Sequence, residues 1–254
     1  MTMGLLQELI QKKTEGIRSF AVLIDPDKTD SAESLTNLVR LCMENRVDYF
    51  FVGGSFVTKN HIPMVVHTIK KLTSIPVILF PGSNLHIDLN ADAILFLSLI
   101  SGRNPDFLIG QQVLAAPILK NSQIEVMPTG YILIGDNNHS TVSYMSNTTP
   151  IPSDKNSVAA CTALAGEMLG MKIIYMDAGS GAEKPVPGKM IKKVSNTIES
   201  PLIIGGGLNS IEKITTAIRS GADTIVVGNG IEDNQQLLVE IADYLQKENS
   251  LKIH

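Results

Sequence analysis

Two stretches in the last quarter of the chain decide the fold: residues 202–207 read LIIGGG, and residues 224–230 read TIVVGNG. Each is a short apolar run that ends in glycine and precedes a helical pattern. Six similar runs come before them, at residues 20–25, 49–52, 77–80, 93–97, 124–134 and 173–177. All are rich in Val, Ile, Leu and Phe and scarcely alternate with polar residues, which is typical of parallel strands covered on both faces.

Helical patterns separate the apolar runs, at residues 31–45, 60–73, 105–120, 157–169, 188–197, 210–220 and 233–248. Eight strands alternating with helices predict the α/β class and a single (β/α)8 TIM barrel that spans residues 1–254. Residues 1–18 are expected to form an N-terminal helix that packs on the barrel. A doubly wound open sheet is the alternative. It usually has a glycine-rich first turn, however, and the first turn here is Asp25-Pro26-Asp27-Lys28.

Three segments depart from a regular pattern. Residues 84–90 are too short and polar for a full barrel helix, so the third helix position is expected to be irregular. Residues 135–154 form a long polar segment after the fifth run, and loops of this length in a compact domain are usually lids or binding loops. Pro128 interrupts the fifth run. Because a proline in a central strand costs a ladder hydrogen bond, we expect a bulge or bend there.

Composition excludes several classes of protein. The chain has 254 residues, of which 44% are hydrophobic, so low-complexity disorder is excluded. A formal charge of −4 and the lack of a basic block argue against a nucleic-acid partner. No apolar run approaches the roughly 20 residues that span a bilayer, so we expect a cytoplasmic protein. Cys42 and Cys161 show no spacing typical of a disulfide framework or a zinc site.

The glycines after the seventh and eighth strands predict a phosphate site. Barrel chemistry gathers at the carboxyl ends of the strands, and the loops after strands seven and eight form a recurrent phosphate site in this fold. Gly205, Gly206 and Gly207 in one loop, and Gly228 and Gly230 on either side of Asn229 in the other, would let backbone N–H groups approach an anion beside a helix N-terminus. The alternative is that these glycines only make tight strand-to-helix turns.

The sixth strand ends in Tyr-Met-Asp-Ala-Gly-Ser-Gly, residues 175–181, which places an acid at the strand tip before a loop of small residues. Backbone amides of this loop and the Ser180 hydroxyl could bind the same phosphate. The Asp177 carboxylate could accept hydrogen bonds from a polyol or take a proton from a hydroxyl group. A simple cap of the next turn is the alternative role for Asp177.

The first two strand tips predict a metal site. Asp25 follows the first run directly, and Ser55 follows Gly53 and Gly54 at the end of the second run. One carboxylate and one hydroxyl with open coordination positions suit Mg²⁺ when a substrate phosphate completes the shell. The alternative for Asp25 is an Asx-turn into Pro26.

A few more side chains near strand ends are of interest. Tyr131 either reaches the barrel centre or packs in the core, and the sequence leaves both open. His86 and His139 lie in polar loops, where we expect them to be solvated. Three methionines near strand tips are candidates to line an adaptable apolar groove: Met127, Met145 and Met176.

The motifs LIDPDK, FVGGS, EVMPTGY, YMDAGSGA, IIGGG and VVGNG occur in this order between residues 20 and 232. Together they resemble the geranylgeranylglyceryl phosphate synthase family, including its bacterial heptaprenylglyceryl relatives. The glycine motifs are shared by many phosphate-binding barrels, whereas the combination of the first, second and sixth strand tips is more specific. The longer form with DAGSGA is similar to the second subgroup, whose members form dimers or hexamers, so we expect a homo-oligomer.

The resemblance implies a Mg²⁺-dependent prenyltransferase of phospholipid biosynthesis. Such an enzyme moves a polyprenyl group from its diphosphate to the C3 hydroxyl of sn-glycerol 1-phosphate. The expected prenyl group is geranylgeranyl, and transient membrane contact is expected when the product leaves. The likeness does not fix the prenyl chain length. In the shorter bacterial members a Lys stands where this chain has Leu23, and Lys28 is a candidate to supply the missing charge.

Carried over by motif, Asp25 and Ser55 would hold the metal and the diphosphate. Asp177 would orient or deprotonate the attacking hydroxyl, with Tyr175 as a second catalytic candidate. The residues implied to bind glycerol phosphate are Tyr175, Met176, Asp177, Ala178, Gly179, Ser180, Gly181, Gly206, Gly207, Gly228 and Asn229.

Two other functions remain open at this point. A different phosphate-binding barrel enzyme, such as a sugar-phosphate isomerase or lyase, usually needs an acid/base pair or a Lys at an inner strand tip, and no Lys ends a predicted strand. A phosphometabolite-binding protein without enzyme activity would leave the acidic tip at Asp25 without a purpose.

Overall fold

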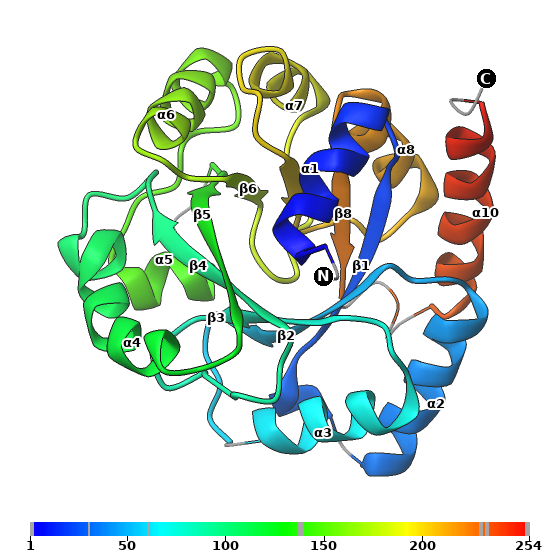
Figure 1. Ribbon diagram of the computed structural model, residues 1–254. Helices are drawn as coiled ribbons and strands as arrows, with labels where there is room; N and C mark the ends of the chain where they lie inside the picture. The colour runs from blue at the N-terminus through cyan, green and yellow to red at the C-terminus, as the bar shows by residue number, and fades with distance from the viewer. Residues whose placement is uncertain are drawn as a thin grey trace.

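Eight parallel strands close into a barrel in the order in which they occur along the chain (Figure 1). The structure is a computed structural model that describes residues 3–29, 31–59, 61–136, 140–228, 231 and 234–251. The strands are β1 Ser19–Ile24, β2 Tyr49–Gly54, β3 Val77–Pro81, β4 Ala93–Leu99, β5 Glu125–Leu133, β6 Ile173–Asp177, β7 Leu202–Gly205 and β8 Thr224–Val227. The predicted (β/α)8 barrel is confirmed, and the open sheet is excluded because β1 pairs with β8.

Helices surround the barrel as the apolar periodicity predicts. They are α1 Leu5–Glu15, α2 Ala32–Glu44, α3 Ile62–Leu72, α4 Gln111–Lys120, α5 Thr141–Ser146, α6 Asn156–Met168, α7 Gly188–Ser195, α8 Ile211–Arg219 and α10 Gln236–Ser250, with the short turns η1 Pro26–Lys28 and η2 Asp106–Gly110. Local sequence fixes several ends: the hydroxyls of Ser31 and Ser210 accept N–H groups in the first turns of α2 and α8. None of the helices in the described residues is long and apolar enough to cross a membrane.

Strand side chains alternate between two apolar clusters. One cluster fills the barrel interior and includes Phe51, Tyr131 and Tyr175; the other lies between strands and helices and includes Met176. Helix α1 lies across one end of the barrel (Figure 1), where its Leu9 joins the interior cluster. Glu125, the first residue of β5, accepts the backbone N–H groups that begin α1. The opposite end, at the carboxyl tips of the strands, holds the predicted site.

The third helix position is irregular, as predicted. Residues 82–92 contain turns and no helix between β3 and β4. The β3–β4 ladder runs only from Ile78↔Ala93 to Leu79↔Ile94, whereas the β4–β5 ladder continues to Leu99↔Tyr131. Beyond Leu79 and Ile94, β3 and β4 are therefore no longer paired, and the barrel wall can admit side chains or a ligand between them.

The bulge expected at Pro128 is wrong. The β4–β5 register is continuous through Phe96↔Pro128. The Pro128 carbonyl accepts the Lys172 N–H at 2.8 Å, so this residue directs its backbone polar groups toward β6. Strand β6 begins only at Ile173, opposite Thr129. The missing proline N–H thus falls where no ladder bond is needed, and the strand stays regular.

Candidate functional site

Two cavities meet at the carboxyl ends of the strands. We call the first the polar cavity; it is lined by Leu23, Asp25, Lys28, Gly53, Gly54, Ser55, Phe56, Phe80, Thr141, Tyr175, Asp177, Ser180, Gly181, Ala182, Gly206, Gly207, Leu208, Asn209, Val226, Val227 and Gly228. We call the second the side groove; it is mainly apolar, and its lining includes Ile94, Phe96, Phe107 and Met145. Gly54, Ser55 and Phe80 line both. The two cavities therefore share one wall.

Most of the predicted site residues lie together in the polar cavity. Asp25 and Ser55 reach it from β1 and β2, and Tyr175 and Asp177 reach it from β6. The loop residues that also line it are Ser180, Gly181, Gly206, Gly207 and Gly228. Asn229 lies outside the described residues, as does His139. The two predicted anion sites thus face one another across a single cavity.

Three residues of the β6 tip do not line this cavity. The Met176 side chain is fully buried in the cluster between strands and helices, because it alternates with its inward neighbours Tyr175 and Asp177. The Met176 side chain therefore does not line the polar cavity. Ala178 packs against the same outer cluster. Gly179, with φ +94°, turns the chain and donates its N–H to Asp177 Oδ1 at 2.7 Å. These residues shape the tip of β6.

Asp177 is a buried carboxylate with both oxygens bonded. Oδ1 accepts the Gly179 N–H, and Oδ2 accepts the Tyr131 hydroxyl at 2.5 Å. Burial raises the pKa of Asp177 above its ordinary value, while the bonds from Tyr131 and Gly179 oppose that rise. A carboxylate whose pKa lies closer to neutrality is better suited to take a proton from a hydroxyl group.

Tyr131 completes this part of the site, a role that the sequence left open. Its ring centroid lies 5.5 Å from that of Tyr175, which stacks on Phe80 at 5.2 Å. Tyr131 lines the side groove while its hydroxyl bonds Asp177 in the polar cavity, so it links the two spaces. Burial raises the pKa of both tyrosines, which keeps their hydroxyls protonated as donors. Only the strand register reveals that Tyr131 faces the interior.

Asp25 forms the turn that the sequence offered as its alternative role, and it also lines the polar cavity. Its Oδ1 accepts the Asp27 N–H at 3.1 Å and so begins the η1 turn. The same carboxylate lines the polar cavity, where an added Cβ on Gly54 would lie 3.9 Å from it. Burial raises the pKa of Asp25, and the positive charge of Lys28 opposes that rise. Asp25 therefore lies beside the Gly54–Ser55 tip, and Lys28 lines the cavity near it.

Glycine is required where the β6 and β7 tips meet. Gly206 has φ +79°, and a Cβ on it would collide with Asp177 Oδ1 and lie 2.7 Å from the amide nitrogens of Ala178 and Gly179. Bare main chain of the two loops thus lies side by side at the cavity wall. Helix α8 begins four residues after Gly207, which adds the positive end of its dipole to this side.

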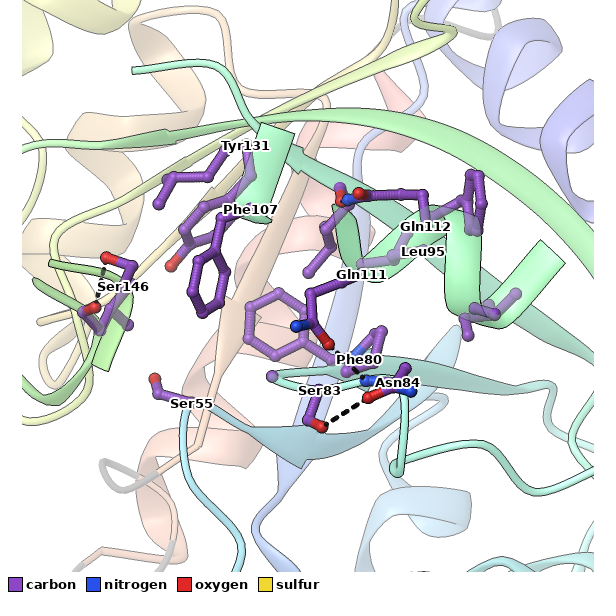
Figure 2. Close-up of a pocket in the computed structure, with 18 of the residues that line it drawn as sticks. Ser55, Phe80, Ser83, Asn84, Leu95, Phe107, Gln111, Gln112, Tyr131 and Ser146 are labelled. Carbon is purple, nitrogen blue, oxygen red and sulfur yellow. Dashed lines mark hydrogen bonds between the residues drawn. The ribbon is translucent and has the colours of Figure 1, made fainter. Parts of the chain in front are cut away.

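The side groove passes through the opening between β3 and β4. On its walls Figure 2 shows Ser83 and Asn84 opposite Gln111 of α4, with Phe80 near its centre and Ser55 and Tyr131 toward one end. Leu97 lies beyond the β3–β4 ladder, and Gln112 Nε2 donates to its carbonyl oxygen in place of a β3 partner. Of the three predicted groove methionines, Met145 lines it; Met127 is buried in the barrel interior.

The segment of residues 135–154 contributes to both cavities. Its part from Ser140 onward contains helix α5, in which Thr141 lines the polar cavity and Val142 and Met145 line the side groove. The residues that sequence reasoning missed are thus those of the groove, chiefly Phe107, Gln111 and Gln112. A possible signal was the polar, helix-free stretch after β3, which leaves that part of the wall uncovered.

Comparison with known proteins identifies relatives over nearly the whole chain. A geranylgeranylglyceryl phosphate synthase of Chitinophaga pinensis is 54% identical over 92% of this chain and 92% of its own. One of Pyrococcus horikoshii is 44% identical over 93% and 92%. The crystal structure of (S)-3-O-geranylgeranylglyceryl phosphate synthase from Thermoplasma acidophilum, in complex with its substrate sn-glycerol-1-phosphate, matches with a TM-score of 0.90 and 29% identity, covering 97% of this chain and all of that one. The model of the PcrB family matches residues 10–245, and this chain belongs to that family.

Proposed function

We propose that this protein transfers a prenyl group from a prenyl diphosphate to the C3 hydroxyl of sn-glycerol 1-phosphate and forms an ether-linked prenylglyceryl phosphate. The observation that carries the proposal is the meeting of a polar cavity and an apolar groove at Ser55, Phe80 and the Tyr131–Asp177 pair. A polar acceptor and a long hydrocarbon need two such spaces joined at the reacting atoms. The names of the relatives and the glycerol phosphate in the Thermoplasma acidophilum enzyme support it.

The acceptor binds in the polar cavity. Its phosphate lies against the main chain of the β6 and β7 tips near Ser180, Gly206 and Gly207, where amides and the α8 dipole favour an anion. This placement brings its free hydroxyl toward Asp177. The hydroxyl of Tyr175, which lies against Gly205, is a further donor in reach of the acceptor.

The reaction exchanges one C–O bond for another. The acceptor oxygen forms a bond with the first carbon of the prenyl chain, and the bond from that carbon to the diphosphate breaks with both electrons going to the diphosphate. Asp177 takes the hydroxyl proton, and Tyr131 holds its carboxylate in place through the 2.5 Å hydrogen bond. The carboxylate that removes the proton is thus itself held in position by Tyr131.

Asp25 and Ser55 are the residues that we propose for Mg²⁺. Among the described residues no group of three or more His, Cys, Asp and Glu side chains could hold a metal ion. One carboxylate and one hydroxyl fit an ion that takes its remaining ligands from water and the diphosphate. When bound, Mg²⁺ would neutralise charge on the departing diphosphate. Lys28 lies beside Asp25 and supplies a positive charge from the chain itself. It would thereby replace the lysine that shorter bacterial relatives have at the position of Leu23.

The side groove takes the prenyl tail, and geranylgeranyl is the expected group. Phe80, Leu95, Phe96 and Phe107 provide its apolar wall, and burial of hydrocarbon there stabilises the complex. A sugar-phosphate isomerase or lyase would have no use for this groove. We also expect the reaction to occur in the cytoplasm, with brief membrane contact because the product carries a long apolar chain.

An exposed apolar face on α4 supports the proposed homo-oligomer. Four large apolar side chains are exposed here, Ile109 at the end of η2 and Val113, Leu114 and Ile118 on α4. Asp106 lies exposed at the start of the η2–α4 unit and Lys120 exposed at its end. Two copies packed antiparallel about Val113 would bury the apolar face and pair each Asp106 with the partner's Lys120. Such a face is self-complementary, as a twofold interface requires.

Sedimentation tests the dimer. Val113→Glu should convert the oligomer into smaller species, whereas Met43→Glu, at an exposed methionine on α2, should not. A wild-type monomer, or equal behaviour of both variants, would refute this interface.

Incubation with labelled sn-glycerol 1-phosphate and a panel of prenyl diphosphates tests the activity itself. Mass analysis of the organic phase should find a labelled prenylglyceryl phosphate and reveal the preferred chain length. Asp177→Asn should give little product under the same conditions. Absence of any labelled ether with every diphosphate, with MgCl2 present, would refute the proposed function.

A further inference from the structure

Residues 82–92, which replace a barrel helix, contain a buried histidine. The side chain of His86 is only 9% exposed, so its expected solvation is wrong. Its Nδ1 accepts the Gly82 N–H at 3.2 Å, and its own backbone N–H donates to the Ser83 carbonyl at 3.1 Å. These two bonds close a tight turn directly after β3.

This turn contacts both halves of the proposed site. Gly82, Ser83 and Asn84 line the side groove, and the Asn84 N–H donates to Gln111 Oε1 at 3.2 Å, the bond drawn between them in Figure 2. On its other side Gly82 packs against the end of β2, since a Cβ there would lie 2.6 Å from the Ser55 carbonyl oxygen. The position of Gly82 therefore affects the groove rim and the Ser55 backbone together.

The bond from Gly82 requires a neutral imidazole. A ring nitrogen accepts a hydrogen bond only without a proton, so the structure implies that His86 carries its proton on Nε2. Burial lowers the pKa of His86, and the Asp27 carboxylate on η1 is the charge that opposes this. The neutral form thus prevails at neutral pH. Protonation at lower pH would place an N–H on Nδ1 against the Gly82 N–H, and the bond would be lost.

We propose that His86 is a positioning residue for the prenyl diphosphate: its neutral imidazole holds Gly82, and thereby the groove rim and the Ser55 backbone, in the arrangement that binds this substrate. The proposal rests on the proposed function. It assigns His86 no contact with the reacting atoms. Binding of the prenyl diphosphate should weaken when His86 is protonated, whereas binding of sn-glycerol 1-phosphate, on the far side of the cavity, should not.

His86→Asn is the conservative variant. Asparagine can place its side-chain oxygen near the position of Nδ1 and accept the Gly82 N–H, yet it does not titrate. The KM values for geranylgeranyl diphosphate and for sn-glycerol 1-phosphate are measured from pH 8 to pH 5 for wild type and variant. An unreactive thio-analogue of geranylgeranyl diphosphate gives the dissociation constant in parallel. Titration of the diphosphate and of Asp25 and Asp177 affects both proteins alike, so the ratio of the two proteins isolates His86.

The ratio of the His86→Asn KM to the wild-type KM for the diphosphate should be near one at pH 8. It should fall toward about one fifth as the pH approaches 5, because only the wild type loses the bond to Gly82 and one net hydrogen bond represents about this factor. His86→Leu, which lacks the acceptor, should show the weaker binding already at pH 8. The ratio for sn-glycerol 1-phosphate should stay constant. A diphosphate ratio that does not change with pH would overturn the role of His86 while leaving prenyl transfer intact; absence of transfer and of analogue binding in the wild type would overturn both.

Discussion

Removal of the Tyr131 hydroxyl tests the central feature of the site, the hydrogen bond from Tyr131 in the side groove to the Asp177 carboxylate. Tyr131→Phe keeps the ring between Phe80 and Tyr175 and deletes only the donor to Asp177 Oδ2. Burial raises the pKa of Asp177, and this hydrogen bond lowers it. Without the bond, the pKa of Asp177 should rise further. The carboxylate form should then appear only at higher pH.

The magnitude follows from the strength of the bond. A hydrogen bond to a charged group contributes about 1.5–3 kcal/mol. Since about 1.4 kcal/mol corresponds to one pKa unit, loss of the bond should raise the pKa by roughly one to two units. Below the pKa of Asp177 in the variant, kcat/KM should fall by up to about ten- to a hundredfold relative to wild type. Well above that pH the difference should shrink.

The assay is the pH profile of kcat/KM for sn-glycerol 1-phosphate at saturating prenyl diphosphate. The acidic limb of the variant should lie at higher pH than that of wild type, with its slope unchanged. Tyr144→Phe, at an exposed tyrosine on α5, is the control and should leave the profile in place. An acidic limb of Tyr131→Phe that coincides with wild type would refute the role of Asp177 as the proton acceptor held by Tyr131.

Further predictions concern other parts of the site. Asp177→Asn should lower kcat by roughly 10²- to 10⁴-fold. It should also raise the stability of the fold, because the pKa of Asp177 is raised and its ionised form therefore costs stability as the pH rises from about 3.8. Urea denaturation at pH 7 should show a higher midpoint for the variant than for wild type, and an unchanged midpoint would contradict this. Asp25→Asn, or EDTA with wild type, should abolish transfer while circular dichroism stays native, and full activity in either case would remove the metal role. Gly206→Ala should raise KM for sn-glycerol 1-phosphate, because its φ of +79° and its contact with Asp177 exclude a side chain; an unaltered KM would speak against a phosphate at this loop. Gln112→Leu should destabilise the fold by about 1–3 kcal/mol by leaving the Leu97 carbonyl unpaired, with the exposed Gln123→Leu as a near-neutral comparison in denaturation.

The strands were predictable because each is a continuous apolar run, and the barrel rule then located the site at their carboxyl ends. That rule brought Asp25, Ser55 and Asp177 together from residues up to 152 apart in the sequence. It uses only chain order, since in a barrel consecutive strands are neighbours. The placement of these residues thus follows from the apolar pattern, although their roles stay predictions.

Features that depend on register were not predictable. Whether Tyr131 points inward and Met176 outward depends on the phase of side-chain alternation, which a continuous apolar run does not reveal. Whether Pro128 disrupts its strand depends on where β6 begins. The burial of His86 depends on the turn after β3, which the polar composition of residues 82–92 does not predict. In each case the deciding contact is with a neighbouring strand or loop that the local sequence does not specify.

The early parting of β3 and β4 puts the opening in the barrel wall apart from the strand tips. A tail that leaves the barrel sideways meets α4 and residues 82–92, while the strand tips that carry Asp25 and Asp177 lie elsewhere. On the proposed function, substitutions in this wall would change the length of the lipid that is made while the chemistry at the strand tips stays the same. Lipid length would then be set by one helix and one turn.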